Sequence, residues 1–116
     1  MEHGSINYIE FAAKDLDKTK AFFESVFQWQ FEDYGPEYTA FTAKGLMGGF
    51  YQSELACDAS AGGALMVFYS QGLEQTEQDI LEAGGMIKRD IFAFPGGRRF
   101  HFCEPSGNEM AVWSDK

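Results

Sequence analysis

The sequence predicts an α+β fold in which two βαβββ repeats form curled mixed sheets around a cleft. Each half of the chain shows a strand pattern, then a helix pattern, then three further strand patterns. The two helix patterns begin at Leu16 and Leu73, an offset of 57 residues, and the opening strands repeat at nearly the same offset. We therefore expect one domain over residues 1–116, with repeats at about 5–52 and 63–114.

The first repeat opens with a strand, because SINYIEFAA at residues 5–13 alternates and is rich in strand formers. DLDKTKAFFESVF then predicts a helix capped by Asp15. The residues with helical spacing along one face are Leu16, Thr19, Phe23, Val26 and Phe27. WQFEDYG and EYTAFTAKG predict two strands around a Gly-Pro turn, and LMGGFYQ predicts a third strand that its paired glycines weaken.

The second repeat begins after SELACDASAGG, a loop of small and polar residues. ALMVFYS, at residues 64–70, predicts its opening strand, and LEQTEQDILEAGG predicts a helix that ends at Gly84. We expect this helix to turn Leu73, Ile80 and Leu81 inward. MIKRDIFAF, RRFHFCE and NEMAVWS predict the last three strands, with a Pro-Gly-Gly turn between the first two.

Composition and charge exclude several classes of partner. The net charge of −9 argues against nucleic acid, which selects basic surfaces, and against anionic membranes. No stretch approaches the roughly 20 apolar residues of a transmembrane helix, and the first residues lack a signal-peptide pattern. Cys57 and Cys103 form no CxxC motif, so we expect free thiols in a reducing cytoplasm. The 12 Phe, 5 Tyr and 2 Trp favour an aromatic cavity in addition to the core.

Two segments resemble a known family. DLDKTKAFFESVFQW and EPSGNEMAVW are similar to recurrent segments of the vicinal oxygen chelate superfamily. This group includes glyoxalase I, extradiol dioxygenases, fosfomycin-resistance enzymes and bleomycin-binding proteins. The resemblance covers essentially the whole chain. It implies the paired βαβββ fold, a cleft for a small organic molecule, and the pairing of two chains into a homodimer.

The resemblance also marks the positions at which metal-dependent members of this superfamily hold a cation. Carried onto this chain, these positions fall on Tyr8, Leu65 and Ala111. Leucine and alanine cannot coordinate a metal, and a neutral tyrosine is a poor ligand. We therefore expect no metal and no other cofactor.

The EPSG turn sets the register of the last hairpin. A type I turn with Gly107 in a left-handed conformation pairs Glu104 with Asn108 and, further out, His101 with Ala111. Paired residues share a sheet face, so the same reasoning gives the face that lines the cleft. The expected cleft residues are Tyr8, Glu10, Leu65, Val67, Tyr69, Arg99, His101, Cys103, Glu109 and Trp113.

Each polar residue on this face has a functional and a structural interpretation. His101 and Glu109 are candidate acid–base groups, but a strand histidine bonded to a neighbour and a glutamate paired with Arg99 fit the same pattern. Arg99 also suits an anionic group of a ligand. Cys103 beside a glutamate is expected to be an inert thiol, because negative charge disfavours the thiolate. Trp113 suits either stacking on a ligand or packing of the pocket wall.

Three functions fit these residues. The first is metal-free binding of a small, partly aromatic compound in the cleft. The second is a glyoxalase-like lyase or isomerase with Glu109 or Glu10 as base and His101 or Arg99 steadying the enolate. The absence of a cation weakens it, because the enolate loses its main stabiliser. The third is a non-catalytic dimeric interaction module whose cleft is vestigial.

Overall fold

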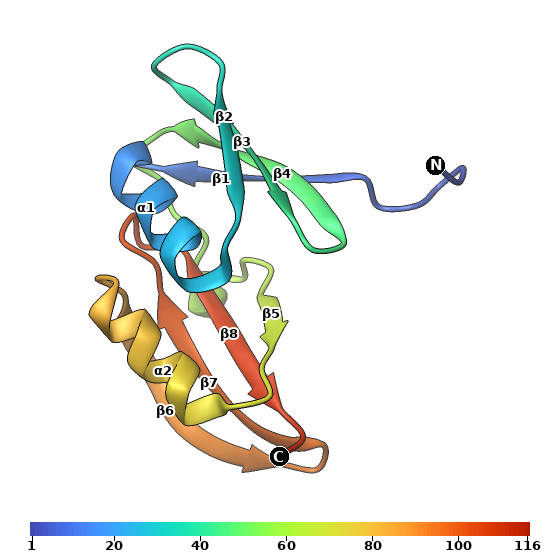
Figure 1. Cartoon of the computed structure of the whole chain (residues 1–116), viewed down its shortest axis with the longest axis vertical. Helices are drawn as coiled ribbons and strands as arrows, with labels where there is room; N and C mark the ends of the chain where they lie inside the picture. The colour runs from blue at the N-terminus through green and yellow to red at the C-terminus, as the bar shows by residue number, and fades with distance from the viewer.

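Two four-stranded sheets, each with one helix, make up the computed structural model, which describes all residues 1–116 (Figure 1). The first repeat consists of β1 (Tyr8–Ala13), α1 (Leu16–Phe27), β2 (Gln30–Asp33), β3 (Tyr38–Ala43) and β4 (Leu46–Gln52). The connection contains a short 3₁₀ helix, η1 (Ala59–Ala61). The second repeat consists of β5 (Met66–Tyr69), α2 (Leu73–Glu82), β6 (Met86–Phe94), β7 (Gly97–Cys103) and β8 (Glu109–Ser114).

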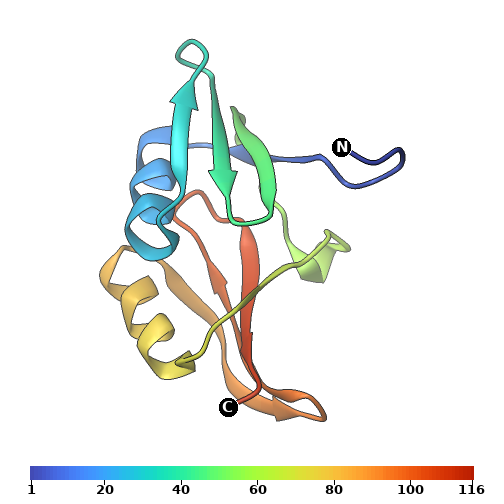
Figure 2. The same ribbon diagram turned by 45° about the vertical axis from the view of Figure 1, so that its right-hand side comes forward.

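Both sheets have the same topology. The strand order is β1-β4-β3-β2 in one and β5-β8-β7-β6 in the other. In each sheet the first strand of the repeat runs parallel to the last, and the other pairs are antiparallel. Figure 2 shows both helices on one side of the molecule. The predicted α+β fold of two βαβββ repeats is confirmed, and we call the face of each sheet that is turned away from its helix the cleft face.

Local chemistry explains the start of α1 and the buried face of α2. Asp15 caps α1, since its carboxylate accepts a hydrogen bond from the Lys18 N–H at 3.0 Å. In α2, Leu73 and Ile80 are buried, but Leu81 is 47% exposed. The prediction that Leu81 points inward is wrong, because it lies about 100° around the helix from Ile80 and only a narrow stripe of α2 faces the sheet. Neither helix is long and apolar enough to cross a membrane.

One aromatic-rich core joins the two repeats. Phe23 stacks on Trp29 with ring centroids 4.3 Å apart, and Trp29 stacks on Phe41 at 4.2 Å. Phe27 of α1 stacks on Phe68 of β5 at 4.0 Å, which links the first repeat to the second. The buried cluster draws side chains from both helices and both sheets. Because burying one large apolar side chain contributes about 1.5–3 kcal/mol, separating the repeats would be costly.

The turn between β7 and β8 has the predicted register. Gly107 has a φ of +95°, and its N–H donates to the Glu104 carbonyl at 2.8 Å. The Glu104 N–H donates to the Asn108 carbonyl at 3.1 Å. The ladder then continues outward from the pair Cys103 and Glu109. The hairpin prediction is therefore confirmed pair by pair.

The same turn fastens the two repeats together through buried polar contacts. The Glu104 carboxylate, 1% exposed, accepts from the Thr19 hydroxyl of α1 at 2.6 Å. It also accepts from the N–H groups of Ser106 at 2.9 Å and Asn108 at 3.1 Å. The Asn108 side-chain amide donates to the Ala12 carbonyl of β1 at 2.8 Å. EPSGN thus satisfies buried polar groups at the junction of the repeats, which is a structural role.

Candidate functional site

The cleft face of the second sheet carries most of the predicted site. In the ladders, Arg99 lies opposite Trp113 and His101 opposite Ala111, and Tyr69 lies beside Trp113 on the parallel strand. Residues at paired positions share a sheet face. The residues brought together in this way are Val67, Tyr69, Arg99, His101, Cys103, Glu109 and Trp113. Leu65 lies one residue before β5 begins.

Three side chains on this face form a hydrogen-bonded row that we call the Arg99 row: Arg99, His101 and Glu109. Arg99 Nη2 lies 2.9 Å from His101 Nε2, and His101 Nδ1 lies 3.0 Å from Glu109 Oε2. A guanidinium can only donate, so His101 Nε2 must accept and Nδ1 must carry the hydrogen that is donated to Glu109. The two neighbours therefore select one neutral tautomer of His101.

Glu109 is held on both sides of its carboxylate. Its second oxygen, Oε1, accepts from the Ala59 N–H at 3.2 Å, and the residue is only 6% exposed. Ala59 belongs to η1 in the connection between the repeats, so this contact ties that segment to β8. The buried carboxylate positions His101, and through it Arg99, with few atoms left open to solvent.

Arg99 is the least satisfied member of the row. Its Nε is buried without a hydrogen-bond partner, and only Nη2 among its nitrogens bonds to a protein atom. Buried donors almost always have partners, so an orphaned one at a cavity calls for a functional reason. Arg99 borders a cavity of about 320 Å³, the remaining lining residues of which are Val67, Phe94, Gly96 and Trp113.

Several aromatic rings lie on the same part of the second sheet as Arg99. The Trp113 ring meets Tyr69 edge-on at 5.2 Å and Phe94 at 6.2 Å, and Phe92 lies 5.8 Å from the guanidinium carbon. Sequence reasoning missed Phe92 and Phe94. The alternation of MIKRDIFAF was available as a signal, but the pairing of β6 with β7 shifts register twice, between Ile87 and Arg89 and again before Phe92. Simple alternation cannot predict which face a side chain takes beyond such irregularities.

Both cysteines are free thiols in unreactive surroundings. Burial raises the pKa of Cys103, the nearby Glu109 carboxylate adds to the rise, and Lys88 opposes it. Burial, followed by the charges of Glu109 and Asp58, raises the pKa of Cys57. The thiolate is the reactive form, so neither residue is prepared to act as a nucleophile.

The cleft face of the first sheet carries a second polar group, formed by Tyr8, Tyr38 and Glu10. The Tyr38 hydroxyl donates to Glu10 Oε2 at 2.9 Å, and the two tyrosine hydroxyls lie 2.5 Å apart. Burial raises the pKa of Tyr38, and its hydrogen bonds to Tyr8 and Glu10 raise it further. A Cβ at Gly49 would collide with the Tyr38 hydroxyl, so this glycine makes room for the phenol. Sequence reasoning missed Tyr38, although its cross-strand position was a usable signal.

The predicted site residues fall into two groups that do not meet. Tyr8 and Glu10 lie on β1 of the first sheet, whereas Arg99, His101 and Trp113 lie on β7 and β8 of the second. Each group has its own hydrogen bonds, and none joins one group to the other. Within one chain, the expected cleft is therefore two separate half-sites.

The positions at which related metalloenzymes hold a cation do not fit one here. The Tyr8 hydroxyl is hydrogen-bonded to the Tyr38 hydroxyl, and the Leu65 side chain has no atom that can ligate a metal. Ala111 is fully buried in the middle of β8. No group of three or more His, Cys, Asp or Glu side chains is arranged to hold a metal ion. The donor chemistry of these positions is unsuited to a divalent cation.

Two βαβββ repeats, each a four-stranded mixed sheet with one helix, define the class of paired-repeat α+β proteins. The model of the Glyoxalase/Bleomycin resistance protein/Dioxygenase superfamily matches residues 5–112, and the chain belongs to this superfamily. No curated protein matches the chain.

Several solved structures share the fold. A glyoxalase-related enzyme from Fulvimarina pelagi superposes with a TM-score of 0.79 at 15% identity, over 96% of this chain and 88% of that one. A fosfomycin resistance protein from Listeria monocytogenes superposes with a TM-score of 0.75 at 18% identity, over 98% of this chain and 93% of that one. A lactoylglutathione lyase from Agrobacterium tumefaciens superposes with a TM-score of 0.70 at 19% identity, over 98% of this chain and 97% of that one. At these identities the likeness extends to the fold alone.

Proposed function

We propose that this chain binds a small aromatic compound with an acidic group on the cleft face of its second sheet, without a metal. The observation that carries the proposal is Arg99, which has an orphaned Nε and borders a cavity walled by Trp113 and Phe94. A guanidinium pairs well with a carboxylate, and aromatic rings stack on a planar ligand. The cavity volume of about 320 Å³ lies at the lower end of the range for small-molecule pockets.

The Arg99 row supports binding more than catalysis. A glyoxalase-like lyase or isomerase needs a base that is free to take a proton. Both oxygens of Glu109 and both ring nitrogens of His101 are already engaged in hydrogen bonds. These contacts hold Arg99 in position, which favours a rigid anion-binding site. The replaced ligand positions Tyr8, Leu65 and Ala111 support the metal-free form of the proposal.

The test is ligand-induced thermal stabilisation, with Arg99→Met compared against Arg98→Met. Benzoate, salicylate and 4-hydroxybenzoate should raise the melting temperature of the wild type, whereas the uncharged amide benzamide should raise it less. The Arg99 variant should lose this stabilisation. Arg98 is the matched control, because it is adjacent in sequence but pairs with Glu74 of α2 on the opposite face. Equal stabilisation of both variants would contradict the proposal.

Native mass spectrometry of the purified protein tests the metal-free aspect directly. The expected mass is that of the polypeptide, with or without a retained organic ligand. Stoichiometric zinc, nickel or iron would overturn this aspect, and a proton-transfer activity lost in Glu109→Gln would favour the lyase or isomerase function instead.

We also propose that two copies of the chain pair through their cleft faces. Large apolar side chains are exposed on these faces, including Tyr8 at 39%, Val67 at 43% and Tyr69 at 48%. Exposed apolar side chains on both sheets give each cleft face a surface suited to a second chain. Light scattering should give twice the monomer mass of 13.0 kDa. A monomer mass at all concentrations would refute pairing while leaving ligand binding open.

A further inference from the structure

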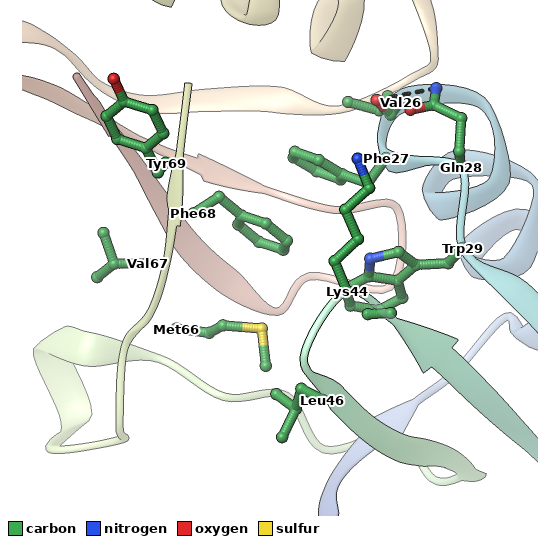
Figure 3. A pocket seen from close by; sticks show the side chains of 11 residues that line it. Val26, Phe27, Gln28, Trp29, Lys44, Leu46, Met66, Val67, Phe68 and Tyr69 are labelled. Carbon is green, nitrogen blue, oxygen red and sulfur yellow. Dashed lines mark hydrogen bonds between the residues drawn. The ribbon is translucent and has the colours of Figure 1, made fainter. Parts of the chain in front are cut away.

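A second cavity lies where the two repeats meet, at the edge of the second sheet. It has a volume of about 450 Å³ and is built from the end of α1, the β3–β4 turn and β5 (Figure 3). Val67 is the one residue that it shares with the cavity beside Arg99. Its lining residues are Val26, Phe27, Gln28, Trp29, Ala43, Lys44, Leu46, Met66, Val67, Phe68 and Tyr69.

The walls of this junction cavity are largely apolar. Nine of its 11 lining residues are hydrophobic. Phe27 and Phe68 stack in parallel, 4.0 Å apart and inclined by 9°, and form one rigid wall. Figure 3 shows Met66 and Leu46 along another side. A surface of this composition and size accommodates the apolar body of a small molecule.

Two polar groups at the cavity have no protein partner and carry a hydrogen to donate. Trp29 is only 6% exposed as a whole, but its indole nitrogen lies on the open part of the ring and donates to no protein atom. Figure 3 shows this nitrogen on the side of the ring that faces Phe68. The Lys44 ammonium extends along the cavity and forms no ion pair. An open indole N–H on the wall of an apolar cavity is free to donate to a ligand atom in place of water.

The other side-chain donors of the cavity are already occupied. The Gln28 amide donates to the Ser25 and Val26 carbonyls at 3.0 and 3.3 Å, which closes the end of α1. The Tyr69 hydroxyl donates to Asp115 at 2.6 Å. The donors that remain to recognise a ligand are therefore one N–H and one cation, and the cation favours an acceptor with negative charge.

We propose that the junction cavity binds an amphipathic monocarboxylate. The carboxylate accepts from the Trp29 indole and pairs with the Lys44 ammonium, while the apolar body lies against Phe27, Phe68 and Met66. The net charge of −9 disfavours ligands with several negative charges, which leaves a single anionic group as the best match. This site is separate from the one proposed at Arg99 and does not depend on it.

The experiment is a titration with decanoate that follows Trp29 fluorescence in the Trp113→Phe variant. This background leaves Trp29 as the sole tryptophan and also removes a wall of the cavity beside Arg99. Decanoate should change the emission in a saturable way. Adding Lys44→Met should weaken binding about tenfold or more, as expected for loss of a charge-assisted contact.

Control variants and a control ligand distinguish the junction cavity from binding elsewhere on the chain. Lys14→Met, which removes another surface lysine without an ion pair, should leave the affinity unchanged, as should Arg99→Met. Decanol, which lacks the charge, should bind more weakly than decanoate. No saturable change would overturn the proposal. Equal affinity in the Lys44 variant, or loss of binding in the Arg99 variant, would also overturn it. An emission change that follows protein concentration rather than decanoate would indicate a second chain as the occupant and would refute the proposal.

Discussion

At the scale of single residues, polar side chains on both cleft faces are fixed by one another. His101 lies between a group that only donates and a carboxylate that only accepts, so its ring has one tautomer. Tyr38 lies between a second phenol and Glu10 in the same manner. Such rows keep groups in place with little conformational freedom, which suits a preorganised binding surface.

The half-buried phenol of Tyr38 should make stability depend on alkaline pH. Its pKa is raised in the fold, so it stabilises the fold while protonated, and this contribution is lost as the pH rises above about 10, the pKa of an unfolded tyrosine. The free energy of unfolding should therefore fall more steeply above this pH in the wild type than in Tyr38→Phe. Urea denaturation between about pH 8 and 11 measures both slopes, and parallel curves would count against the assignment.

The cysteines should be slow to alkylate. Because burial raises the pKa of Cys103, little thiolate exists near neutral pH and little of it is accessible. In a Cys57→Ser background, iodoacetamide should modify the native protein far more slowly than the urea-unfolded chain, and faster as the pH rises. Mass spectrometry over time gives the rates; equal native and unfolded rates would show that Cys103 is exposed in solution.

At the scale of elements, the β7–β8 turn does more than reverse the chain. It places a buried carboxylate against Thr19 of α1 and a buried amide against Ala12 of β1. One turn therefore satisfies donors and acceptors that belong to the other repeat. The segment EPSGN is informative about the fold for this reason, and its Glu104 plays no part in the Arg99 row.

Removing the buried carboxylate should be costly. Glu104→Ala leaves the Thr19 hydroxyl and backbone N–H groups without their acceptor, so the free energy of unfolding should fall by about 3 kcal/mol. Glu74→Ala is the control, because its exposed pair with Arg98 is worth about 1 kcal/mol or less. Urea denaturation compares the two, and similar losses would mean that the turn does not hold the repeats together.

At the scale of the whole molecule, two similar repeats share one core. Aromatic stacking between α1 and β5 and the buried contacts of the β7–β8 turn cross the boundary between them. The cleft faces are left open, with the half-site of Tyr38 on one sheet and the Arg99 row on the other. The repeats are similar in architecture and share one buried core.

Unfolding should accordingly be a single transition. In Trp113→Phe, the fluorescence of Trp29 reports on the first repeat, while far-UV circular dichroism reports on the helices and strands of both. Their thermal midpoints should coincide, as in a two-state domain. Midpoints several degrees apart would show that the repeats unfold separately and that the shared core contributes little coupling.

Much of the fold could be predicted from the sequence because the relevant signals are local. Strand alternation, helical spacing and turn residues predicted the order of elements, and LMGGFYQ and MIKRDIFAF match β4 and β6 at both ends. The EPSG turn predicted the register of the last hairpin, and hence which side chains share a face with His101. The outward orientation of Leu81 and the face of Phe94 were not predictable in this way, because packing and strand irregularities decide them.

By itself, the sequence determined the two repeats and the hairpin register, and it predicted that Tyr8, Leu65 and Ala111 stand at the positions where metal-dependent relatives hold a cation. Only the tertiary structure decided that Glu104 reaches Thr19, 85 residues away, and that Trp29 and Lys44 border one cavity with β5. The tertiary structure also brings Arg99 Nη2 to His101 Nε2 and leaves Arg99 Nε without a hydrogen-bond partner. The physical reason is that periodicity and turns act between neighbours in the chain, whereas cavities and polar networks depend on contacts that form only after the repeats have packed.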